Sequence, residues 1–193
     1  MWPWGHAAVA YLAYRVGWLR GRRAPDGDEA VALGVAALAA DLVDKPLAHG
    51  VDALASGRSL AHTVFVALAL SALVAAYVHR GGGRGAVAFA VGHWTHLAAD
   101  GLHSLLVGDW RGLAYLDWPL GAHPDPVPAA SFLEYVTTVY LARTTGPVRL
   151  VPPDDRAWFL LQVPLALGTL ALWWRDGAPG VDRVRSALPP AGR

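Results

Sequence analysis

The sequence contains no cysteine and comparatively few charged residues. Without cysteine the chain can form no disulfide, no thiolate metal site and no cysteine nucleophile, so any metal must be held by nitrogen and oxygen ligands. Charged residues make up 16% of the chain, against about 25% in a typical soluble protein. The formal net charge is only +1, and no basic stretch has interleaved aromatic residues, so a nucleic-acid partner is not expected.

Hydrophobic residues are abundant instead. They make up 54% of the chain, and most of the nine tryptophans lie near the ends of hydrophobic segments, as in membrane-interface belts. The composition therefore predicts an all-α fold, a membrane-embedded bundle of about five hydrophobic helices. The expected helices are 6–19, a second capped by Asp28 and ended or kinked at Pro46, a third beginning near Ser59, 86–107, and 158–174.

The domain organisation follows from the same reading. Residues 1–174 are expected to form one integral-membrane domain, with a long polar connection at 108–157 that contains an amphipathic helix at 130–142. The Gly-, Pro- and Arg-containing tail, 175–193, is expected to be disordered and cytoplasmic. Lys and Arg are more frequent in the loops on the side of the tail, which places the N-terminus on the extracytoplasmic side of the cell (inner) membrane. The sequence predicts no particular oligomeric state.

The stretch GHWTHLAADGLHSLLV, residues 92–107, concentrates polar side chains in an apolar helix. His96 and Asp100 are four residues apart and share a helix face, and His93 and His103 lie close to that face. Buried His and Asp side chains need a hydrogen bond, an ion pair or a metal. Two interpretations stay open on this evidence: a metal site, or packing histidines that each donate to a backbone carbonyl.

The predicted topology brings further candidate ligands to the same side of the bundle. His6 opens the first helix, Asp41 and Asp44 close the second, and His62 opens the third. Imidazoles and carboxylates together suit zinc, and also manganese or iron(II). The number of carboxylates allows one or two metal ions, and a catalytic zinc lowers the pKa of a bound water to about 7.

Four blocks in this order carry a family resemblance: GHAAVAYLAY, DLVDKP, GRSLAHT and GHWTHLAAD, followed by Trp118 and Pro119 in YLDWPL. Together they span residues 5–119. The ordered set resembles the YdjM family of membrane-bound, metal-dependent hydrolases. It is also similar to the superfamily of zinc-dependent phospholipases C and single-strand nucleases.

The resemblance implies metal roles for five residues: His6, Asp41, His62, His96 and Asp100. The chain departs from the family motif at Asp41 and Asp44, so either carboxylate could be the primary ligand. Asp41 is favoured, with Asp44 as a bridging carboxylate or a support for another ligand. The second His-x-x-x-Asp pair of the soluble enzymes is missing, and His103 is the candidate that could partly replace it. Asp100 and Asp44 are the catalytic candidates. The implied activity is hydrolysis of a phosphoester, either a small molecule, a lipid headgroup or a lipid-linked phosphate, by a membrane-bound enzyme.

Two other functions are compatible with the sequence. The same His and Asp residues could form a site that transports metal ions or protons, although no internal repeat is present. The protein could also be a non-catalytic membrane protein with a vestigial metal site.

Overall fold

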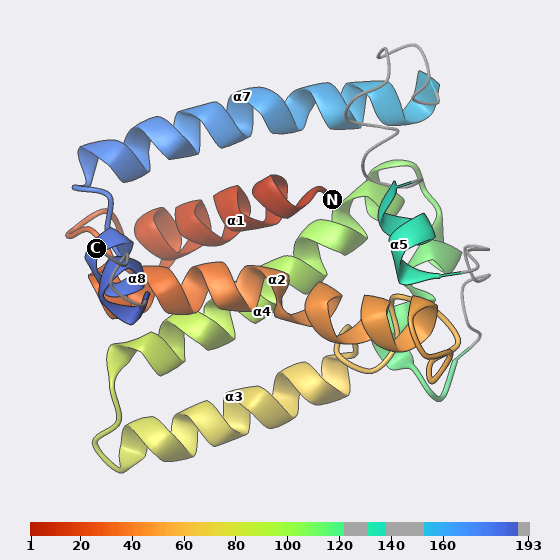
Figure 1. The fold of residues 1–193 in the computed structure, drawn as a ribbon, viewed down its shortest axis with the longest axis horizontal. Coiled ribbons are helices and arrows are strands. Elements are labelled where there is room, and N and C mark those ends of the chain that lie inside the picture. The colour runs from red at the N-terminus through yellow and green to blue at the C-terminus, as the bar shows by residue number, and fades with distance from the viewer. Residues whose placement is uncertain (122–130, 138–152, 189–193) are drawn as a thin grey trace, which may run out of the picture.

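The computed structural model describes residues 1–121, 131–137 and 153–188 of the chain (Figure 1). In these ranges every regular element is a helix, which confirms the all-α prediction. In chain order the elements are α1 (Pro3–Leu12), the π-helical turn η1 (Ala13–Trp18), α2 (Gly27–His49), α3 (Val64–His79), α4 (Arg84–Leu106), the 3-10 helix η2 (Trp110–Asp117), α5 (Phe132–Tyr135), α7 (Pro153–Arg175) and α8 (Val181–Ala187).

Helices α2 and α4 cross at the centre of the molecule. Helix α1 packs on both of them and lies between α2 and α7, while α3 packs along α4 on the opposite side (Figure 1). The N-terminal end of α1 therefore points at the middle of α4. This arrangement brings the first residues of the chain beside the histidine-rich part of α4.

Several helix boundaries differ from the predicted ones. Helix α1 begins at Pro3 rather than at residue 6, and α7 begins at Pro153 rather than at residue 158. Asp26, rather than Asp28, caps α2: its side chain accepts from the backbone N–H of Glu29 at 2.9 Å, and the Glu29 carboxylate accepts from the Asp26 N–H. Pro46 lies inside α2, which continues to His49. Helix α3 begins at Val64, directly after its N-cap residue Thr63, so residues 59–62 belong to the preceding loop.

No helix in the described ranges combines the length and the apolar composition required to cross a membrane. Helix α3 has 16 residues, whereas a span needs about 20. The membrane-embedded part of the prediction thus gains no support from these helices.

The C-terminal third also differs from expectation. Part of the tail expected to be disordered forms α8, which packs against α2 and places Arg183 Nε 3.0 Å from Asp28 Oδ1. The long connection contains η2, which the sequence reading did not identify, and α5. Residues 130 and 138–142 of the amphipathic helix expected at 130–142 lie outside the described residues.

Small side chains let α2 and α4 approach closely. The core cluster consists of Ala10, Tyr14, Leu33, Ala37 and Ala88. Close packing of this kind leaves no space for additional atoms.

A substitution at Gly92 of α4 tests how closely α2 and α4 approach each other where they cross. A Cβ atom there would lie 2.8 Å from the Cβ of Ala36 and 3.2 Å from the carbonyl oxygen of Leu33. Gly92→Ala is therefore expected to lower the free energy of unfolding by about 1–3 kcal/mol, because the helices must move apart. Gly34→Ala on α2 is the matched control: a Cβ there meets no atom within 4 Å, and a helical alanine is expected to stabilise by about 0.5–1 kcal/mol. Urea unfolding measures both, and equal effects of the two substitutions would contradict the inferred crossing.

A buried ionic network anchors the N-terminal segment to α2. The Tyr14 hydroxyl donates to Glu29 Oε1 at 2.7 Å, and the Arg23 guanidinium donates to both oxygens of the same carboxylate. Burial alone would raise the pKa of Glu29, but hydrogen bonds from Arg23, the Asp26 backbone and Tyr14 lower it to about 2. The ionised carboxylate thus holds η1 on α2, and α1 is fixed in the position that presents His6 to α4.

Candidate metal centre

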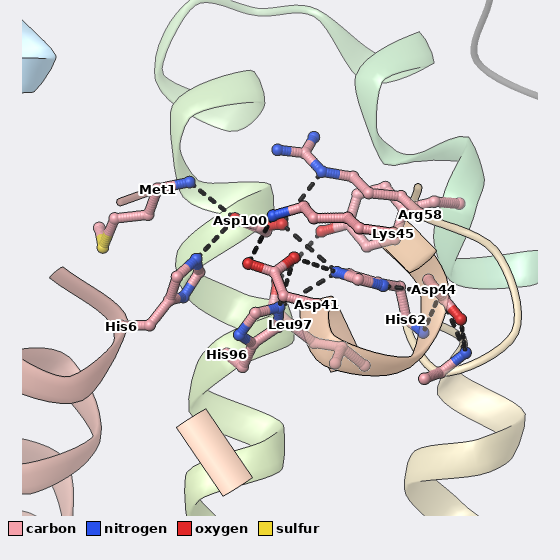
Figure 2. A network of polar contacts seen from close by, with 12 residues as sticks. Met1, His6, Asp41, Asp44, Lys45, Arg58, His62, His96, Leu97 and Asp100 are labelled. Atoms are coloured by element: carbon pink, nitrogen blue, oxygen red, sulfur yellow. Dashed lines mark hydrogen bonds and ion pairs between the residues drawn. The ribbon is translucent and has the colours of Figure 1, made fainter. Parts of the chain in front are cut away.

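Four buried side chains converge where α2, α4 and the loop before α3 meet (Figure 2). Asp41 comes from α2, His62 from the loop, and His96 and Asp100 from successive turns of α4. One potential ligand atom from each residue lies within 4.8 Å of all the others. The shared helix face predicted for His96 and Asp100 is therefore part of a cluster with two imidazoles and two carboxylates.

The two imidazoles are oriented by partners on their outer nitrogens. His96 Nδ1 lies 2.7 Å from the carbonyl oxygen of Ala37, and His62 Nδ1 lies 2.8 Å from Asp44 Oδ2. A carbonyl only accepts, so His96 Nδ1 carries a hydrogen, and the carboxylate favours the same state of His62. The two Nε2 atoms face each other at 3.1 Å. Two lone pairs at this distance repel each other unless a proton or a metal ion lies between the rings.

Asp44 lies on the outer side of His62 and is not one of the four clustered residues. Its carboxylate accepts from the backbone N–H groups of Ser59 at 2.8 Å and Ala61 at 2.9 Å as well as from His62. A carboxylate behind a ligating histidine fixes the tautomer and the ring orientation. In this position Asp44 fits the supporting role implied by the resemblance rather than the bridging one.

The two carboxylate oxygens of Asp41 have different neighbours: one faces the imidazoles and the other faces a cation. Oδ1 lies 3.4 Å from His62 Nε2 and 3.9 Å from His96 Nε2, whereas Oδ2 lies 2.6 Å from Lys45 Nζ. One oxygen is thus directed at the position where the potential ligand atoms converge and the other at Lys45, one helical turn further along α2.

The two carboxylate oxygens of Asp100 also have different neighbours. Oδ2 lies 3.0 Å from Arg58 Nε and 3.8 Å from His62 Nε2. Oδ1 lies 2.7 Å from the Met1 ammonium group and 3.1 Å from His6 Nε2. Asp100 therefore connects the four-residue cluster to the start of α1.

The electrostatic environment favours the metal-binding protonation state at Asp41, Asp100 and His96. Burial alone would raise the pKa of Asp100, but the nearby Arg58, the Met1 ammonium and His6 hold it well below its usual range. Burial lowers the pKa of His96 to about 3. At His62 burial lowers the pKa, but hydrogen bonds to Asp41 and Asp44 outweigh it and raise the pKa above its usual value. Ionised carboxylates and neutral imidazoles are the forms in which these groups coordinate metals.

His6 lies beside the cluster rather than in it. Its ring stacks on that of His96 with the centroids 4.0 Å apart, and its Nε2 faces Asp100. Neither ring nitrogen of His6 has a well-aligned hydrogen-bond partner within the described part of the chain. A ligand role for His6 is compatible with this position and stays a prediction.

The structure does not bring His103 into the cluster. Its ring packs against Trp158 of α7 with the centroids 5.4 Å apart. His93, the other supporting candidate on α4, is buried, and neither of its ring nitrogens has a hydrogen-bond partner among the described residues. The potential metal ligands on α4 are therefore His96 and Asp100.

Sequence reasoning assigned no role to three residues that line the cluster: Lys45, Arg58 and Tyr115. The signal for Lys45 was present, because it follows Asp41 by four residues on one helix. Arg58 lies in the block GRSLAHT, four residues before His62. Tyr115 lies on η2, and its hydroxyl donates to the carbonyl oxygen of Leu97 at 3.0 Å while its ring lies under the Arg58 guanidinium.

Comparison with protein-family models, with curated proteins and with solved structures gives no match. The resemblance to the YdjM family stays a prediction.

Proposed function

We propose that the protein is a metal-dependent hydrolase that acts on a phosphoester. The observation that carries the proposal is the pair of imidazoles whose Nδ1 atoms are engaged by Ala37 and Asp44 and whose Nε2 atoms point at one position beside two carboxylates. Packing histidines need only one satisfied nitrogen each, whereas here the second nitrogens of both rings face one another at 3.1 Å beside two carboxylates.

The donor set indicates the metal. Two nitrogen and two oxygen ligands suit zinc, and they also accept manganese or iron(II). A bound divalent ion would supply an activated water near neutral pH and would polarise the phosphoryl oxygen. The chain's own contribution is to hold the imidazoles in the metal-binding tautomer, to keep Asp41 and Asp100 ionised, and to bury the ligands.

The proposal includes association with lipid. Apolar side chains are exposed along α3, including Phe65, Leu68 and Leu73, and along α7, including Leu161 and Trp174. Exposed apolar patches are typical of membrane or partner contacts. They support association with a membrane and, with it, a substrate that is a lipid headgroup or a lipid-linked phosphate. The extracytoplasmic position of the N-terminus stays a prediction from the sequence.

Metal analysis of the detergent-purified protein, combined with a hydrolysis assay, tests this function. We expect one or two zinc, manganese or iron ions per chain, and hydrolysis of a phosphomonoester or phosphodiester from a panel that includes phospholipids in mixed micelles. Chelation should abolish hydrolysis and zinc should restore it. Protein that binds no divalent metal from solution would overturn the proposal.

A further inference from the structure

The candidate metal centre has an ordered gradient of exposure. The side chains of His62 and His96 are fully buried. Those of Asp100 and Asp41 are 3% and 10% exposed, and those of Lys45 and Arg58 are 13% and 40% exposed. In Figure 2 the two cations approach the carboxylates from the side opposite His96. A molecule that reaches the centre from solvent therefore meets Arg58 and Lys45 first.

Both cations are held in place by the structure. Lys45 Nζ contacts Asp41 Oδ2 at 2.6 Å, and Arg58 Nε contacts Asp100 Oδ2 at 3.0 Å. The Arg58 guanidinium also lies over the ring of Tyr115, 5.6 Å from its centroid, and Tyr115 is completely buried. The guanidinium is thus positioned at the entrance by an ion pair and a cation–π contact.

The charge balance of the cluster favours the binding of an anion when a metal ion is present. Lys45, Arg58 and the Met1 ammonium already balance the carboxylates of Asp41, Asp44 and Asp100, so the two positive charges of a divalent metal ion would remain uncompensated. Uncompensated charge in a buried site is costly. A negatively charged group bound between the metal position and the two cations would remove the excess.

We propose that Lys45 and Arg58 form an anion-binding rim over the metal centre and position the phosphoryl group of the substrate. The inference rests on the proposed metal-dependent function and deepens it, because it assigns the substrate an anionic group and identifies the residues that bind it. Arginine forms paired hydrogen bonds to phosphate oxygens, and lysine contributes a point charge. Both are positioning residues.

Isothermal titration calorimetry on the full chain in detergent tests the rim. The metal probe is zinc, and the anion probe is methylphosphonate, which mimics a phosphate but has no hydrolysable ester bond. The variants are Lys45→Gln and Arg58→Gln, with Arg183→Gln as the control. Arg183 belongs to an exposed ion pair on α8, so its substitution removes the same charge at a distance from the centre.

We expect each rim variant to weaken methylphosphonate binding to the zinc-loaded protein about tenfold, the effect of one charge-assisted hydrogen bond. Zinc affinity should stay equal or become tighter, because a cation that competes for a carboxylate has been removed. Arg183→Gln should change neither affinity. A structural role for the two residues would weaken zinc and anion binding together and would overturn the proposal, as would zinc-loaded variants with wild-type anion affinity.

The outcome separates the rim from the proposed function. Wild-type protein that binds no zinc contradicts the function, whereas protein that binds zinc but not methylphosphonate contradicts the rim alone. Parallel titration with a short-chain phosphatidic acid identifies the source of the phosphoryl group: tighter binding than methylphosphonate supports a lipid, and equal binding supports a small phosphoester.

Lys45 allows a second readout because it is the only lysine in the sequence. Reductive methylation of a lysine side chain, followed by mass spectrometry, reports on this residue alone. Methylphosphonate should slow the methylation of Lys45 in zinc-loaded protein and should have no effect in metal-free protein. Equal rates with and without the anion in the zinc-loaded protein would contradict the proposed contact.

Discussion

Saturating zinc is expected to raise the thermal unfolding midpoint of the wild-type protein and to leave that of His96→Ala unchanged. A ligand at 100 times its dissociation constant stabilises the folded state by about 2.7 kcal/mol, which corresponds to roughly 5–10 °C for a chain of this size. His96 is fully buried, and its Nε2 faces the potential ligand atoms of His62 and Asp41. Removing the imidazole takes one of the two nitrogen donors from the cluster.

Calorimetry should give the same result as thermal unfolding. Zinc affinity in His96→Ala should fall by more than about 100-fold, beyond what the loss of a partner hydrogen-bonded to a ligand costs. His79→Ala is the matched control, since His79 is an exposed histidine at the end of α3. Circular dichroism of the metal-free proteins separates a loss of metal binding from a loss of fold. Wild-type zinc affinity in a folded His96→Ala protein would contradict a metal role for His96.

The part of the site on α4 was predictable from the sequence, because helical spacing fixes which residues share a face. His96 and Asp100 are four residues apart, and the structure places both of them in the cluster. Asp41 and His62 were expected on the same side of the bundle from helix order and from the family resemblance. Their convergence with α4 is a tertiary feature that spacing alone does not determine.

The residues at the entrance were harder to predict. Arg58 reaches Asp100 only because the loop before α3 folds back over α4, and that loop was assigned in part to a helix beginning near Ser59. Thr63 caps α3 instead, since its side chain accepts from the backbone N–H of Val66 at 3.2 Å. Because the third helix was expected to begin near Ser59, the loop that places Arg58 beside Asp100 was not predicted.

The use of apolar residues also differs from the simplest reading of composition. The second expected membrane helix contains the apolar run VALGVAALAA, residues 31–40. In the structure Ala36 and Ala37 of this run are completely buried, and the α4 residues Gly92 and Ala88 are buried as well. Small side chains in this run let two helix backbones approach until the Ala37 carbonyl reaches His96. Composition records how apolar a segment is but does not distinguish helix–helix packing from contact with lipid.

Asp44→Asn is expected to weaken zinc binding by about 10–100-fold, the usual effect of losing the partner of a ligating histidine. The Asp44 carboxylate accepts from His62 Nδ1 and from the backbone N–H groups of Ser59 and Ala61. An asparagine of the same shape has only one oxygen, so its NH₂ group must face one of these donors.

The amide can avoid that clash by donating to His62 Nδ1. The ring hydrogen of His62 then moves to Nε2, the nitrogen that faces the cluster, and the imidazole can no longer coordinate a metal through that atom. NMR of the histidine ring nitrogens distinguishes the two tautomers, and calorimetry measures zinc affinity. Asp52→Asn, an exposed substitution in the loop that follows α2, serves as the control. Unchanged zinc affinity in Asp44→Asn, with His62 still protonated on Nδ1, would show that Asp44 does not select the metal-binding tautomer.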